Sequence, residues 1–179
     1  YDWVDTDLGG DVDAGELTIA GTDETDTTDG TWSVSGLGPL AAGHKYVVKE
    51  AGETGWLQTY PTPNQYIVNA TSGNDTTGIN FANFENIAIS GYKWADVNHD
   101  SEWDEGEDGV GGWTINLYKW TDSLVNPGVV DGDELMLLDT AETADGTTDA
   151  NGDLVIDALD RGYYEFTNLG PLDSGEKYF

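Results

Sequence analysis

The feature that most constrains the fold of this chain is an internal repeat. Residues 30–46 (GTWSVSGLGPLAAGHKY) align without gaps on residues 162–178 (GYYEFTNLGPLDSGEKY), at an offset of 132 residues. Both segments read G-x-aromatic-x-apolar-x-x-L-G-P-L-x-x-G-x-K-Y. Repetition of this kind is typical of chains in which one structural unit occurs in series.

Shorter matches extend the repeat toward the N-terminus. Residues 1–3 match 118–120, and residues 11–13 match 131–133, at smaller offsets that indicate insertions between equivalent strands. The repeat therefore predicts two domains in tandem, the first spanning residues 1–86 and the second 87–179. In this alignment the first domain lacks the opening strand and loop of the second, and the second lacks the last strands of the first.

The segments around the repeat have the pattern of β-strands. They alternate apolar and polar residues with a period of two, they are rich in β-branched and aromatic residues, and turn residues bound them. No segment shows a convincing helical period. Many short strands separated by turns predict an all-β fold of sandwich or barrel type. The clearest strand candidates are 31–35, 45–49, 65–69, 113–120 and 163–167.

The charge balance is extreme, with 35 Asp and Glu against 6 Lys and Arg and a net charge of −29. Nucleic-acid binding requires a basic surface, so nucleic acid is not expected as a partner. No run of 18 apolar residues is present, so no membrane insertion is expected within this chain. Cysteine is absent, which excludes disulfides and thiolate metal sites. The carboxylates either bind hard cations or act as solvating surface charge.

One acidic segment has the ligand spacing of a calcium loop. Counting from Asp96, side chains with oxygen atoms stand at positions 1, 3, 5, 7, 9 and 12, the spacing of the twelve-residue loop of EF-hand proteins. Position 6 is Ser101, where the sharp turn favours glycine. The flanking segments read as strands rather than helices. The predicted Ca²⁺ ligands are Asp96, Asn98, Asp100, Glu102 (through its carbonyl), Asp104 and Glu107.

Two further acidic clusters resemble this loop less closely. In the first, oxygens stand at positions 1, 3, 7, 9 and 12, but position 5 is Gly9; its candidate ligands are Asp5, Asp7, Asp11, Asp13 and Glu16. The counterpart in the second domain supplies Asp131, Asp133 and Glu134. Their recurrence predicts a second calcium site in each domain. The segment 149–153 (DANGD) is interpreted as an ordinary Asx-Gly turn.

These motifs resemble a known family. The segments 89–100 and 104–118 resemble the start of an SdrD B-like repeat, and the segments 46–50, 55–56, 80–84 and 147–152 resemble later parts of the same module, which belongs to the wider Cna B-type family. The resemblance implies tandem Greek-key, prealbumin-like β-sandwich domains of microbial surface proteins that are rigidified by calcium. It also implies an extracellular location at the cell surface.

The expected function is structural, as part of a stalk, sheath or filament whose partners are other copies of itself or adjoining repeat domains. The alternative is an adhesive or carbohydrate-binding module that recognises a cell-surface or host ligand, because seven Trp residues could stack on sugars. Trp32, Trp94 and Trp113 are expected to fill cores, which favours the structural function. No nucleophile, phosphate-loop or zinc motif is present, so an enzyme is not expected.

Overall fold

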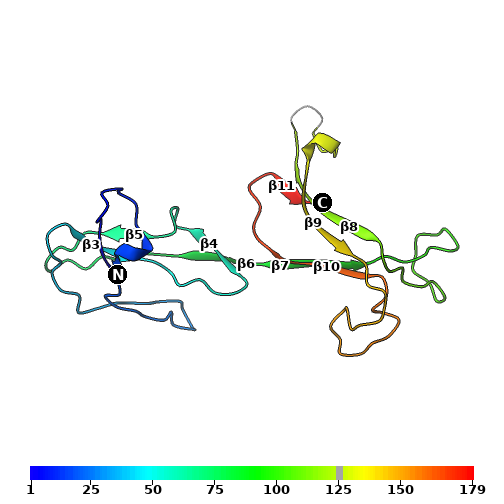
Figure 1. Cartoon of the computed structure of the whole chain (residues 1–179), viewed down its shortest axis with the longest axis horizontal. Helices are drawn as coiled ribbons and strands as arrows, with labels where there is room; N and C mark the ends of the chain where they lie inside the picture. The colour runs from blue at the N-terminus through cyan, green and yellow to red at the C-terminus, as the bar shows by residue number, and fades with distance from the viewer. Residues whose placement is uncertain (124–126) are drawn as a thin grey trace. The chain divides into compact units, whose positions relative to one another are not determined.

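The computed structural model describes residues 1–123 and 127–179, which divide into two compact units, Tyr1–Phe84 and Glu85–Phe179 (Figure 1). Within the described residues the regular structure is strands, with two short 3-10 turns, so the prediction of an all-β chain is confirmed. None of the helical segments in the described part of the chain is long and apolar enough to cross a membrane.

Unit one contains a four-stranded sheet in the order β2-β1-β3-β5 and a two-stranded sheet of β4 and β6. Trp3, Tyr46 and Val47 are buried on the larger sheet, and Val47 has no exposed surface. The elements are β1 (Asp2–Val4), the 3-10 turn η1 (Ala14–Glu16), β2 (Leu17–Thr18), β3 (His44–Val48), β4 (Trp56–Tyr60), β5 (Tyr66–Val68) and β6 (Ala82–Glu85).

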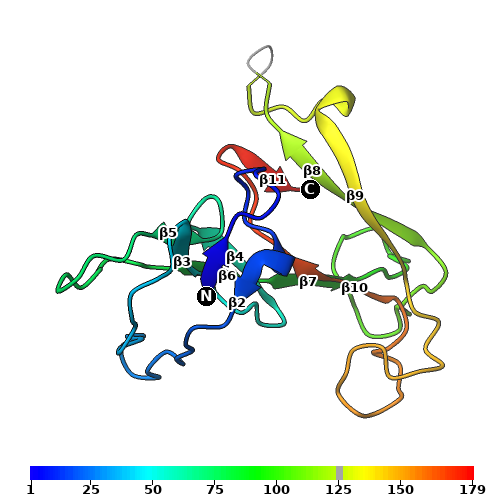
Figure 2. The same cartoon turned by 60° about the vertical axis from the view of Figure 1, so that its left-hand side comes forward.

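Unit two contains a two-stranded sheet of β7 and β10 and a three-stranded sheet in the order β11-β8-β9, both antiparallel (Figure 2). Leu117 of β8 packs with Phe166 and Leu169 of β10, so the core joins the two sheets in a sandwich-like arrangement. The elements are β7 (Ile87–Tyr92), β8 (Thr114–Thr121), the 3-10 turn η2 (Gly132–Glu134), β9 (Leu135–Glu142), β10 (Tyr163–Leu169) and β11 (Glu176–Tyr178).

The repeated segment makes the same contacts in both units. The hydroxyl of Tyr46 donates to the carbonyl of Gly38 at 2.8 Å, and that of Tyr178 donates to Gly170 at 2.5 Å. Each Tyr follows a Lys whose ammonium lies over the buried Trp of the neighbouring strand, 5.6 Å from Trp3 and 5.1 Å from Trp120. The L-G-P-L turn and the K-Y pair of the repeat therefore form one strand-and-turn unit.

Two details of the sequence interpretation are wrong. Residues 31–35 do not form a strand, although their counterpart β10 does. In unit two β10 pairs with β7. In the described part of unit one no strand pairs with residues 31–35, so their backbone groups lack the inter-strand hydrogen bonds of a sheet. Trp113 precedes β8 and is 55% exposed, with Lys93 over its ring, instead of filling the core.

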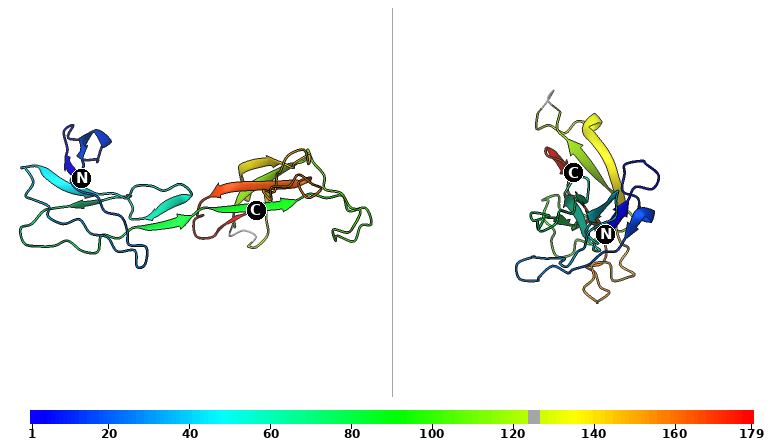
Figure 3. Two further views of the ribbon diagram at one scale, coloured as in Figure 1. Left: turned by 90° about the horizontal axis from the view of Figure 1, so that it is seen from below. Right: turned by 90° about the vertical axis from the view of Figure 1, so that its left-hand side faces the viewer.

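The loops of unit two that matter for function lie at one end of its sheets. Residues 96–107 connect β7 to β8, and residues 149–160 connect β9 to β10. Tyr92 at the end of β7 pairs with Tyr163 at the start of β10, so both loops are found together where β7 ends (Figure 3, left, in green and orange).

Candidate metal-binding loops

The shape of the Asp96 loop (residues 96–107) is fixed by hydrogen bonds from its backbone to the side chain of its first residue. The carboxylate of Asp96 accepts from the backbone N–H of His99 at 2.6 Å and of Ser101 at 3.1 Å. His99 and Ser101 have φ of 64° and 67°, in the left-handed region that favours glycine. Ser101 therefore adopts the turn expected at position 6 despite its side chain.

The Asn98 side chain links two other predicted ligands of the Asp96 loop. The amide nitrogen of Asn98 donates to Asp100 at 2.8 Å and to Asp104 at 3.0 Å. Glu107 closes the loop, because its two carboxylate oxygens accept from the backbone N–H of Val97 at 2.7 Å and of Asp104 at 3.3 Å. The remaining candidate, Glu102, has an exposed side chain and donates its backbone N–H to Asp100 at 2.9 Å.

A second loop of unit two, which the sequence interpretation treated as an ordinary turn, has the same architecture. In the Asp149 loop (residues 149–160), the carboxylate of Asp149 accepts from Gly152 at 2.8 Å and from Leu154 at 2.9 Å. Gly152 and Leu154 have φ of 79° and 71°, at the same two loop positions as His99 and Ser101. Its position-12 carboxylate, Asp160, accepts from the backbone at positions 2 and 9, as Glu107 does.

The signal for the Asp149 loop was present in the sequence. Oxygen-bearing side chains stand at positions 1, 3, 5, 9 and 12, in Asp149, Asn151, Asp153, Asp157 and Asp160. Position 7 is Val155, which could bind a cation only through its backbone carbonyl, as position 7 does in EF-hand loops. The interpretation stopped at the Asn-Gly turn and therefore missed the last two carboxylates.

Asp160 is the most deeply buried charged residue of this loop, with an exposed fraction of 0%. Hydrogen bonds from the backbone N–H groups, first of Asp157 and then of Ala150 and Asn151, hold the pKa of Asp160 below its ordinary value and so favour its charged form. The ion pairs among the described residues are Asp2–His44 and Lys119–Glu176. A buried anion without a cationic partner is expensive, and a bound cation would neutralise it.

The Asp5 loop (residues 5–16) brings three of its five predicted ligands together. Asp5, Asp7 and Glu16 each place a carboxylate oxygen within 4.8 Å of the others. One oxygen of Asp5, Oδ1, is buried and has no hydrogen-bond partner among the described residues. A buried oxygen left without a partner fits a metal ligand. Asp11 and Asp13 lie exposed on the same loop and outside this group.

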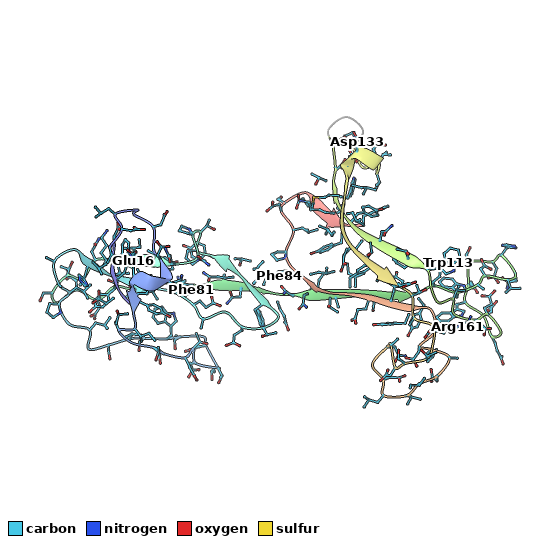
Figure 4. All side chains as sticks on the ribbon, in the orientation of Figure 1. Glu16, Phe81, Phe84, Trp113, Asp133 and Arg161 are labelled. Atoms are coloured by element: carbon cyan, nitrogen blue, oxygen red, sulfur yellow. The ribbon has the colours of Figure 1, made fainter. Side chains whose placement is uncertain are left out.

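Glu16 is fixed by the core of unit one. Figure 4 labels it next to β1, and the indole N–H of Trp3 donates to its carboxylate. This bond, followed by one from the backbone N–H of Thr6, lowers the pKa of Glu16 to about 2. The position-12 carboxylate of the Asp5 loop, a candidate ligand, is therefore held both in place and in its charged form.

The Asp122 loop (residues 122–134) is the counterpart in unit two and is one residue longer. Glu134 accepts from the indole N–H of Trp120 at 2.8 Å and from the backbone N–H of Ser123 at 2.8 Å. Hydrogen bonds from Ser123 and then Trp120 lower the pKa of Glu134 to about 2. The carboxylate of Asp122 accepts from Gly128, so Asp122 stands where Asp5 stands in unit one and is a candidate ligand that the sequence interpretation missed.

The other predicted residues of this loop lie at its end. Asp131 is the N-cap residue of η2 and forms a capping box with Glu134. Asp13 occupies the corresponding N-cap position of η1 in unit one. Asp13 is therefore the counterpart of Asp131, which corrects the alignment of residues 11–13 on 131–133. Asp133, labelled in Figure 4, is exposed on η2.

The donor chemistry of the four loops fits a hard divalent cation. Their interior side chains are carboxylates and amides, the oxygen ligands that Ca²⁺ takes at about 2.3–2.6 Å in flexible geometry. No Lys or Arg stands within any of the four segments. Among the described residues only the Asp5 loop brings three ligand atoms within 4.8 Å of one another, so in the other loops the side chains would have to turn inward to share an ion.

Comparison of the chain with protein-family models, with curated proteins and with solved structures found no match.

Proposed function

We propose that this chain is a calcium-stabilised structural part of an extracellular surface protein, a component of a stalk, sheath or filament. The observation that carries the proposal is the recurrence of one loop geometry. The Asp5, Asp96 and Asp149 loops share left-handed residues at positions 4 and 6 and a position-12 carboxylate that accepts from the backbone at position 2. Unrelated acidic turns would not repeat this arrangement.

Calcium would act by stabilising the folded state. The ligands of a loop can meet only when the flanking strands are in place, so Ca²⁺ would bind the folded chain and raise its stability by mass action. The metal would also remove the repulsion among carboxylates that no Lys or Arg within the loops offsets. The chain carries a net charge of −29, so bound cations would also reduce the overall repulsion among its carboxylates.

The proposed architecture is a pair of Greek-key, prealbumin-like domains related to SdrD B-like and Cna B-type repeats. The sandwich-like core of unit two and the repeated strand-and-turn segment support it. The proposed partners are other copies of the chain or adjoining repeat domains. The proposal is structural rather than enzymatic.

Carbohydrate binding is a second candidate, favoured by the exposure of some aromatic rings. Trp103 is 39% exposed and stacks on Trp94 with the two ring planes 13° apart, and Trp113 is 55% exposed. Trp3 and Trp120 are buried instead, in line with a structural role. A glycan array with the native chain and Trp103→Ala separates the two: retention of glycans by the native chain alone would favour the second candidate.

The direct test of the metal site is calcium titration of matched variants by calorimetry. Glu107→Gln removes the carboxylate that closes the Asp96 loop and is expected to abolish one binding event or weaken it at least tenfold. Asp108→Asn is the control, because the Asp108 side chain lies past the last candidate ligand and, among the described residues, its one hydrogen bond is from the backbone N–H of Ala95 to its carbonyl. Equal titration of the two variants would contradict the loop assignment.

A further inference from the structure

Two matches to the acceptor sequence for N-linked sugar lie close together in unit one. Asn69-Ala-Thr71 and Asn74-Asp-Thr76 both read Asn-x-Thr, and no other Asn of the chain is followed two residues later by Ser or Thr. So short a motif also arises by chance, so its structural context decides whether a transferase can use it. The context that the modification requires is an exposed loop.

The connection between β5 and β6 supplies that context. Every residue from 69 to 78 is exposed, and none belongs to a strand. The backbone N–H of Asn74 donates to the carbonyl of Thr71 at 3.1 Å, so the connection folds back in a tight turn. Among the described residues, the side chains of Asn69, Asn74, Thr71 and Thr76 make no hydrogen bonds. Both amide nitrogens are therefore accessible without disturbance of the sheets.

The surface beside this connection differs from the rest of the chain. Residues 54–74 contain no Asp, Glu, Lys or Arg, the longest such stretch in a sequence of net charge −29. Within it Tyr60 is 52% and Ile67 44% exposed, and the Tyr60 ring lies 6.4 Å from that of Tyr66 at the start of β5. Ile67 and Asn69 are two residues apart in extended chain, so their side chains share one face. A sugar on Asn69 would supply the polar cover that this apolar surface lacks.

We propose that Asn69 and Asn74 carry N-linked oligosaccharides. The inference rests on the extracellular location in the proposed function, because the modification belongs to exported chains. The co-reactant is an oligosaccharide linked to a polyprenyl phosphate. The side-chain amide nitrogen forms a bond to C1 of the first sugar, and the bond from C1 to the phosphate oxygen breaks. The lipid phosphate leaves with that electron pair, and a base of the transferase takes the proton that the amide loses.

The test is mass spectrometry of the protein recovered from the surface of the cells that produce it. Trypsin cleaves after Lys49 and Lys93, with no Lys or Arg between them, so one peptide carries both sites. Fragmentation by electron transfer preserves the bond between sugar and Asn and assigns each sugar to its residue. The expected peptide is heavier than its unmodified sequence, with sugar on both Asn69 and Asn74. A peptide recovered only without sugar overturns the inference.

Matched variants made in the same cells show whether the acceptor sequence is responsible. Thr71→Ala should remove the sugar from Asn69 and leave that on Asn74, whereas Thr71→Ser, which keeps the acceptor sequence, should retain both. Thr76→Ala and Thr76→Ser should act in the same way on Asn74. The two Thr side chains are exposed, so none of these changes is expected to disturb the fold. Sugar that persists on Asn69 in Thr71→Ala would contradict N-linked transfer at this site.

The location of the protein separates this inference from the proposed function. Unmodified protein at the cell surface overturns the glycosylation and leaves the calcium-stabilised structural role standing. Protein found only inside the cell, and unmodified there, overturns both.

Discussion

The indole N–H of Trp3 donates to the carboxylate of Glu16 at 2.9 Å, which joins the buried core of unit one to the last carboxylate of its acidic loop. Trp120 and Glu134 repeat the relationship in unit two. A core aromatic residue thus sets the position and charge of a residue that would touch the metal. Stability of the sheet and affinity for the cation are therefore expected to change together.

Replacing Trp3 by Phe keeps most of the buried ring and removes the bond to Glu16. Outer-shell hydrogen bonds of this kind typically contribute 10–100-fold to metal affinity, so Trp3→Phe should weaken calcium binding by the Asp5 loop about tenfold. The Gly10 amide, which donates to Asp5 at 3.0 Å, reports on this loop in an NMR titration. Trp113→Phe, at an exposed ring, is the control and should leave the Gly10 midpoint unchanged.

The residue at position 6 of the Asp96 loop offers a change that should improve the site. Ser101 has φ of 67°, a conformation that costs a non-glycine residue roughly 1 kcal/mol and costs glycine little. Ser101→Gly should therefore raise calcium affinity by up to about fivefold, whereas the β-branched Ser101→Val should lower it. Calorimetric titration compares the three chains. Equal affinity of the Gly and Val variants would show that this torsion does not limit binding.

The two tyrosine hydroxyls of the repeat should contribute similarly to stability. Tyr46→Phe and Tyr178→Phe each remove one hydrogen bond to a turn carbonyl and should each lower the free energy of unfolding by about 1 kcal/mol. Urea unfolding monitored by tryptophan fluorescence measures the change. Tyr118→Phe is the control, since its hydroxyl makes no hydrogen bond among the described residues. A loss from Tyr118→Phe as large as the other two would refute the assignment.

Glu176 supplies a pH-dependent part of the stability. Its bond with Lys119, at 2.6 Å, and then the backbone N–H of Asp173 lower the pKa of Glu176 in the folded chain. The stabilisation is therefore fully present above the unfolded pKa of about 4.3 and is lost progressively as the pH falls from there through the lower pKa of the folded chain. Glu176→Gln should lower the melting temperature by roughly 2 °C at pH 7 and by much less at pH 3.

The control for this pH dependence is Glu165→Gln, which alters an exposed carboxylate on β10. It should leave the melting temperature nearly unchanged at both pH values. A difference between Glu176→Gln and the native chain that persists undiminished at pH 3 would mean that the charge of Glu176 is not the cause.

The alternation of apolar and polar residues predicted strands correctly where the segment has a neighbouring strand in the structure. It failed where the segment has no such neighbour. Residues 31–35 alternate as regularly as β10 does, yet only β10 lies beside a strand, β7. Trp113 has the character of a core residue but stands one position before β8, and its ring lies exposed under Lys93. Both differences come from tertiary context that a period-two pattern does not contain.

The acidic loops were predictable where their spacing is uninterrupted. The Asp96 loop follows from the positions of its oxygens alone. The Asp149 loop carries nearly the same spacing, but Asn151-Gly152 reads equally well as a turn, and the distinguishing residues Asp157 and Asp160 come later. In the Asp122 loop one extra residue breaks the spacing, so only the structure shows that Asp122 corresponds to Asp5.

The most direct test of the central claim is thermal unfolding of the chain in EDTA, in excess calcium chloride, and in sodium chloride matched to the same ionic strength. The loops predict a melting temperature that rises with calcium concentration, by an amount that sodium chloride does not reproduce, because specific ligands add to stability by mass action. Equal stabilisation by the two salts would mean that the carboxylates are merely screened. That result would contradict calcium binding as the basis of this fold's stability.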